Sequence, residues 1–164
     1  MERSRTELIG IYLNDHLAGA TAGTGLAQRV ARSHDEVADR ATLQRLAGEI
    51  NADRRALMEI MALLGVPVRH YKTTAAWLGE RAGRLKPNGQ LRTRSPLSGL
   101  EELELLRLGV EGKAAGWRTL RELAARDRRL SVSRLDELLA RARTQASQLE
   151  DLRVRAAAHL IEQS

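Results

Sequence analysis

Three polar side chains interrupt apolar seams in the middle of long helical patterns. Asp53 falls between Ile50 and Leu57 in a run of apolar residues with alternating three- and four-residue spacing. Lys113 and Gln145 interrupt two later runs in the same way. Because an unpaired buried carboxylate costs several kcal/mol, these positions predict an internal cluster in which the charge of Asp53 is neutralised.

A further candidate for this cluster is His16, which together with Asp15 flanks the inward face of the first helical run. The partner of Asp53 could be Lys113, Arg54 or His16, since each supplies a positive charge or a hydrogen-bond donor. The predicted internal polar cluster comprises Asp53, Lys113, Gln145 and His16.

Two interpretations of this cluster are open. It is either a structural network that fixes helix register, or an altered ligand site in which Lys113 stands in place of a metal cation. Carboxylates and imidazole suit several divalent ions. The candidate ligands of such a lone metal are Asp15, His16, Glu49, Asp53 and Glu111. Since no complete ligand motif accompanies them, we expect no metal and no other cofactor.

Reactive nucleophiles are scarce in this sequence. There is no cysteine, which excludes a thiolate nucleophile, a disulfide and a cysteine metal cluster. Most serines fall near predicted helix caps or chain ends, and Ser147 alone lies in the middle of a helical run. We therefore assign no catalytic residue, and we expect the chain not to be an enzyme.

Small residues form two rows at helical spacing. The rows are Gly19 with Gly23, and Gly109 with Gly112 and Gly116. Missing side chains allow a neighbouring helix to come close, which is the simpler interpretation of these rows. The alternative is space for a small ligand beside Trp117.

The elements that position these residues are predicted to be α-helices. Hydrophobic residues make up 43% of the 164 residues and aromatic residues only 2%, with no Phe at all. The core must therefore consist of Leu, Ala, Val, Ile and Met, a mixture that suits helices better than sheets. Apolar periodicity predicts helices over about 6–33, 35–64, 74–86, 96–126 and 134–162, within a single domain that spans 1–164. Gly65 followed by Pro67 predicts the end of the second of these helices, and Ser133 is the predicted cap of the last one.

The order of these helices resembles the ferritin-like superfamily. Short links join the first two long helices and the last two, and a long connection joins the halves. The resemblance implies an all-α four-helix bundle with up-down-down-up topology and a long crossover that contains the short helix. Ferritin-like di-metal proteins carry two Glu-x-x-His pairs at mid-bundle, but this sequence contains no such pair. The resemblance therefore does not bring a metal site with it.

The long connection is strongly basic. From Val66 to Ser95, seven cationic residues stand against one acid, Glu80, and this segment carries the whole net charge of +6. The predicted basic patch consists of Arg69, Lys72, Arg81, Arg84, Lys86, Arg92 and Arg94. It is a solvated face, a surface for an acidic protein partner or a second copy of the chain, or a nucleic-acid contact made through phosphates.

Two further observations narrow the class of function. No run of about 18 apolar residues is present, so we expect no membrane span. The first residues lack the apolar region of a secretory signal, which favours the cytoplasm. We expect a non-catalytic ferritin-like bundle that works as a binding or interaction module, as a homodimer. The alternatives are a divergent divalent-metal-binding bundle and a weak electrostatic nucleic-acid binder that uses the 66–95 crossover.

Overall fold

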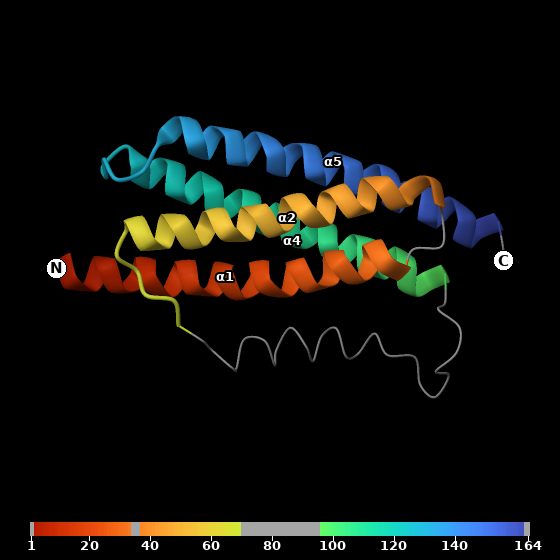
Figure 1. The fold of residues 1–164 in the computed structure, drawn as a ribbon, viewed down its shortest axis with the longest axis horizontal. Coiled ribbons are helices and arrows are strands. Elements are labelled where there is room, and N and C mark those ends of the chain that lie inside the picture. The colour runs from red at the N-terminus through yellow and green to blue at the C-terminus, as the bar shows by residue number, and fades with distance from the viewer. Residues whose placement is uncertain (1, 34–36, 70–95, 163–164) are drawn as a thin grey trace.

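The computed structural model describes residues 2–33, 37–69 and 96–162, and these form a four-helix bundle (Figure 1). The helices are α1 (Glu2–Ser33), α2 (Val37–Leu63), α4 (Pro96–Ala124) and α5 (Val132–Glu162). Within the described ranges, all regular secondary structure is helical, so the predicted all-α fold class is confirmed. The helix predicted at 74–86 lies outside these ranges. The observed helix ends fall within a few residues of the predicted ones, which is the usual precision for helix boundaries.

Each helix packs against two others. The contacts join α1 to α2, α1 to α4, α4 to α5 and α2 to α5. Tyr12, in the first half of α1, donates a hydrogen bond to Thr119 near the end of α4 (3.0 Å). Arg29, near the end of α1, pairs with Glu102 near the start of α4 (3.1 Å). These pairings show that α1 and α4 run in opposite directions.

The core lies between the four helices and is almost entirely aliphatic. Among the described residues, Trp117 is the one large aromatic side chain that is fully buried, with 2% exposure. Burying each leucine contributes roughly 1.5–3 kcal/mol, so this seam supplies most of the driving force for folding. Apolar side chains with less than 2% exposure come from all four helices and include Leu13, Val30, Leu43, Leu46, Met61, Leu103, Leu120, Leu135, Leu138, Leu149 and Leu152.

The C-terminus of α2 ends as predicted from a glycine followed by a proline. Gly65 has a left-handed φ of 69°, which glycine adopts without the strain that a Cβ would bring. The Val66 N–H donates to the carbonyl of Met61 (2.9 Å) and the Gly65 N–H to that of Ala62 (3.0 Å). This pair of bonds is a Schellman motif, which satisfies carbonyls that the helix itself leaves free.

Asn14 fixes the chain that follows α2. Its side chain is buried, donating from Nδ2 to the carbonyls of Gly10 (2.8 Å) and Pro67 (3.1 Å). Its Oδ1 accepts the Arg69 N–H at 2.7 Å. Both polar atoms of the buried amide therefore have partners, and residues 67–69 are held against α1.

The connection between α4 and α5 corrects one predicted helix cap. Ser133 was the expected cap, but α5 begins at Val132 and the capping hydroxyl belongs to Ser131, which accepts the Arg134 N–H at 3.2 Å. Ser131 is better placed because a cap bonds the N–H three residues further on. Asp127 accepts the Arg129 N–H at 3.1 Å, which closes the turn before α5.

The glycine rows have unequal roles. A methyl group built on the buried Gly116 would lie 3.1 Å from the His16 ring, so α1 and α4 approach closely there. At Gly19, Gly23, Gly109 and Gly112, nothing from the described part of the chain lies within 4 Å of such a methyl group. The predicted close approach is therefore right for Gly116 and wrong for the other four positions.

No helix in the described residues is long and apolar enough to cross a membrane.

Candidate functional site

The most unusual interior residue is Asp53, in the middle of α2. It is 1% exposed and is surrounded along its helix by buried apolar residues such as Ile50 and Leu57. The period of the apolar run places Asp53 on the same face as those residues, which forces its carboxylate into the bundle. An ionised carboxylate there is tolerated only if it is paired and hydrogen-bonded.

Both oxygens of Asp53 accept hydrogen bonds from cations. Lys113 of α4 donates from Nζ to Oδ2 at 2.6 Å. Arg141 of α5 donates from Nε to Oδ1 at 2.8 Å, and a terminal nitrogen of the same guanidinium contacts that oxygen too. The carboxylate of α2 is thus held between cations from two other helices. Since these bonds are charge-assisted, they are stronger than hydrogen bonds between neutral groups.

Gln145 of α5 bridges the charges. Its Oε1 accepts from Lys113 Nζ at 2.5 Å. Its Nε2 donates to Asp53 Oδ2 at 3.2 Å and to Glu49 Oε2 at 3.1 Å. The side chain is completely buried, and its oxygen and both of its N–H groups have partners.

The network continues to the surface along α2 and α5. Glu49 lies one turn before Asp53 and pairs with Arg45 at 2.9 Å. Arg45 in turn donates to Gln148 at 3.2 Å, one turn after the buried Gln145. We call Glu49, Asp53, Lys113, Arg141 and Gln145 the central network. Its two carboxylates face two cations within the bundle and a third, Arg45, at the rim.

Burial sets the electrostatics of Lys113. Removal from water lowers the pKa of its ammonium below the ordinary value of 10.5, while the neighbouring Asp53 carboxylate raises it and the Arg141 cation lowers it. The largest of these effects is burial. Asp53 is therefore what keeps a charged lysine tolerable at this position.

The structure brings together three of the four residues predicted for an internal cluster, Asp53, Lys113 and Gln145. His16 lies on the contact between α1 and α4, where its ring meets Tyr12 edge-on with centroids 4.5 Å apart and packs on Gly116. Burial lowers the pKa of His16 below 6.5, an effect that Asp15 partly opposes.

The other partner considered for Asp53 was Arg54. Its Nε donates instead to the Thr21 hydroxyl at 3.1 Å, which ties α2 to α1. Lys113 and Arg141 are the cations that pair with Asp53 in the described part of the molecule.

The residues considered as metal ligands are spread over different faces. Asp15 and Glu111 are exposed, His16 is half-buried on α1, and only Glu49 and Asp53 share the central network. Across 2–33, 37–69 and 96–162, no group of three or more His, Asp or Glu side chains is arranged to hold a metal ion.

Arg141 is the functional residue that the sequence interpretation missed. It stands next to the buried Ala142, on the flank of the apolar stripe, and its guanidinium reaches inward to Asp53. The available signal was its spacing of four residues from Gln145, which places both side chains on one face of α5.

Of the predicted basic patch, only Arg69 is described, and its side chain is exposed. The remaining members, Lys72, Arg81, Arg84, Lys86, Arg92 and Arg94, lie outside the described residues.

Comparisons with models of known protein families, with curated proteins and with solved structures found no match to this chain.

Proposed function

We propose that this chain is a non-catalytic helical bundle that acts as an interaction module through its surface. One observation carries the proposal: the interior carboxylate of Asp53 is neutralised by the protein's own cations, Lys113 and Arg141. Among the described residues, the groups of the central network bond each other, and no buried donor or acceptor of the network lacks a partner. Trp117 Nε1, one turn after Lys113, is a buried donor without a hydrogen-bond partner in the described part of the chain, and it lies outside this network. We place the binding capacity of the bundle on its outer faces.

The arrangement that we propose is ferritin-like, with up-down-down-up topology. Support comes from contacts that pair opposite ends of neighbouring helices. Asn14 in the first half of α1 donates to the carbonyl of Pro67 just after α2, and Tyr12 of α1 meets Thr119 near the end of α4. Arg121 near the end of α4 meets Asp136 near the start of α5. With α1 beside both α2 and α4, and α5 beside both as well, these directions fit that topology.

Within such a bundle, the Lys113 ammonium takes the position of a metal cation. Its Nζ lies 2.6 Å from Asp53 Oδ2 and 2.5 Å from Gln145 Oε1, so two oxygen acceptors already surround a positive charge. A metal ion would have to displace this ammonium and part of the Arg141 guanidinium before it could reach the carboxylate. The competing proposal, a divergent divalent-metal site at Glu49 and Asp53, requires that displacement.

For the surface, the proposed partner is an acidic protein segment or a second copy of the chain. The motive is the segregation of positive charge in residues 66–95, to which Arg69 belongs. A nucleic acid that binds this segment through its phosphates is the competing partner, and steep salt dependence of duplex or single-strand binding would favour it.

The test of the interior part of the proposal is metal content of the purified protein, followed by melting curves with added Fe(II), Mn(II) and Zn(II). We expect no stoichiometric metal and no rise in the melting temperature. Stoichiometric metal, or a large rise at modest metal concentration, would overturn the proposal, since a ligand that binds the folded state stabilises it.

The control for this experiment is Asp53→Asn. A metal bound at the centre would lose affinity in this variant, because an amide is a much weaker ligand than a carboxylate. Metal bound by exposed acids such as Glu111 would be retained, so the variant separates a central site from binding at the surface.

A further inference from the structure

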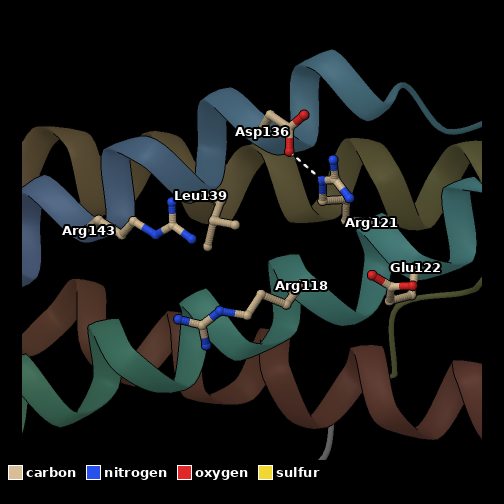
Figure 2. Close-up of a pocket in the computed structure, with 6 residues that line it drawn as sticks. All are labelled: Arg118, Arg121, Glu122, Asp136, Leu139 and Arg143. Atoms are coloured by element: carbon tan, nitrogen blue, oxygen red, sulfur yellow. Dashed lines mark hydrogen bonds and ion pairs between the residues drawn. The ribbon is translucent and has the colours of Figure 1, made fainter.

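A pocket of about 510 Å³ opens on the surface between α4 and α5 (Figure 2). None of its lining residues belongs to the central network. Its lining residues are Arg118, Arg121, Glu122, Asp136, Leu139 and Arg143. Leu139 is 6% exposed and supplies an apolar patch between the charged side chains.

One side of this pocket is closed by an ion pair. Arg121 of α4 donates from Nε to Asp136 of α5 at 2.5 Å, and hydrogen bonding to this carboxylate raises the pKa of Arg121 above its ordinary value. The pair joins the two helices across the pocket and neutralises both charges. Neither group is therefore the main attraction for a ligand.

The other side presents two arginines from opposite walls. Figure 2 shows the Arg118 side chain of α4 and the Arg143 side chain of α5 extending toward the same part of the pocket. In the part of the chain that the structure describes, neither guanidinium has an ion-pair partner. Because both side chains are exposed, their mutual repulsion is weak, and an anion placed between them would be attracted by both guanidinium groups.

We propose that Arg118 and Arg143 bind the side-chain carboxylate of an acidic segment on a partner protein, with apolar atoms of that segment on Leu139. This inference rests on the proposed function as an interaction module, and it adds a binding surface formed by residues outside 66–95. Guanidinium groups are well suited to this role, because their planar forks match a carboxylate with two parallel hydrogen bonds.

The acids at the rim favour a discrete carboxylate over a continuous polyanion. Glu122 and Asp136 border the pocket beside the two free arginines. A nucleic acid that lay along this surface would bring further phosphates close to these carboxylates and be repelled. A protein segment can place one acid between the arginines and apolar or basic residues beside Glu122.

The experiment uses the full chain and a short fluorescent peptide of alternating Glu and Leu, with the Gln–Leu peptide as its uncharged counterpart. Binding is measured by anisotropy, and the Nε–H NMR signals of Arg118 and Arg143 locate the site. We expect the Glu–Leu peptide to bind and to shift both signals, and the Gln–Leu peptide to do neither.

Three variants test the assignment. The double variant Arg118→Gln/Arg143→Gln should weaken peptide binding about ten-fold or more, since each lost charged hydrogen bond costs roughly a factor of several. Arg55→Gln removes an exposed arginine of α2 and should leave the affinity within about two-fold. Glu122→Gln should strengthen binding, because it removes a repulsive charge at the rim. All of these positions are exposed, so circular dichroism should show an unchanged fold.

Equal binding of both peptides would overturn the inference, and so would an unchanged affinity in the double arginine variant. It would also be overturned by tighter binding of duplex DNA or inorganic phosphate than of the Glu–Leu peptide, or by dimerisation that the double variant abolishes. The last two would assign the pocket to a phosphate or to a second copy of the chain. Stoichiometric metal at Asp53 would overturn the proposed function without changing the peptide result. Absence of peptide binding in a metal-free protein would overturn only the assignment of the pocket.

Discussion

The central network and the α4–α5 pocket use the same residue types with opposite results. In the interior, Asp53 has a side-chain exposure of 0% and accepts bonds from Lys113 and Arg141. At the pocket, Arg121 and Asp136 form a comparable pair but are 43% and 48% exposed. Water solvates the surface charges whether or not they are paired, whereas an interior charge without a partner is strongly destabilising.

This difference in exposure indicates which region of the molecule is available to a binding partner. Burial compels the interior groups to bond each other, so they hold the helices in register and leave little for a ligand. Exposure lets Arg118 and Arg143 remain without partners among the described residues at little cost, so they stay available. The same residue types therefore join helices in one region and, as we propose, bind a partner in the other.

The largest expected effect on stability comes from removing the buried carboxylate of Asp53. Asp53→Ala leaves Lys113 and Arg141 near the core without their counter-ion, and we expect the free energy of unfolding to fall by about 3–5 kcal/mol. Urea denaturation measures this loss. Asp136→Ala is the matched control, because it removes the aspartate of an exposed Arg–Asp pair and should cause a far smaller change. A loss within about 0.5 kcal/mol for Asp53→Ala would mean that the carboxylate is not buried.

A second contrast uses glycines of α4. In Gly116→Ala the new methyl group meets the His16 ring at 3.1 Å, and we expect a loss of about 1–3 kcal/mol through overpacking. Gly112→Ala adds the same group where nothing described lies within 4 Å, and it should stabilise the protein by up to about 1 kcal/mol through higher helix propensity. Thermal unfolding of the two variants should give shifts of opposite sign. Equal shifts would contradict the close approach of α1 and α4.

A smaller effect concerns pH. Burial lowers the folded-state pKa of Lys113 below the ordinary value of 10.5. At a pH between the folded-state pKa and 10.5, the unfolded chain therefore binds more protons than the folded one. This group therefore makes stability rise as the pH climbs through that window. Lys113→Met should flatten the rise, which denaturation at several alkaline pH values measures. An identical pH profile for both proteins would show that the ammonium is as well solvated as in the unfolded chain.

The smallest expected effect concerns an exposed pair in the α4–α5 turn. The Arg129 side chain, followed by its backbone N–H, lowers the pKa of Asp127 from 3.8 to about 2. Any stability from this shift is present above 3.8 and is lost as the pH falls toward about 2. Arg129→Gln keeps the backbone bond, so the Asp127 pKa should rise only part of the way, as an NMR titration of the carboxyl can follow. A pKa that does not move would assign the shift to the backbone bond alone.

Sequence pattern predicted those parts of the fold that depend on periodicity and local geometry. Apolar spacing predicted the four-helix bundle, and Gly65 with Pro67 predicted the end of α2. The cap of α5 was misplaced because Ser131 and Ser133 are chemically equivalent candidates, and only the backbone geometry of the turn selects Ser131. The position of Gly116 against His16 required the register between α1 and α4, which no single helix specifies.

The residues of the candidate site also divide into those that the sequence predicted and those that it did not. Polar interruptions in apolar runs pointed to Asp53, Lys113 and Gln145, because each breaks a pattern that is visible in one helix. Arg141 breaks no pattern, since it lies beside the stripe and reaches inward through its long side chain. The convergence of Arg118 and Arg143 depends on the stagger of two helices and could not be predicted from either one.

The central claim is that Asp53 and Lys113 neutralise each other inside the bundle, and a double-mutant cycle tests it most directly. Unfolding free energies are measured for the wild type, Asp53→Asn, Lys113→Met and the double variant. The account predicts a coupling energy of about 1–3 kcal/mol between the two side chains. Additivity of the two single-variant effects within about 0.3–0.5 kcal/mol would contradict this claim, because it would show that Asp53 and Lys113 do not interact.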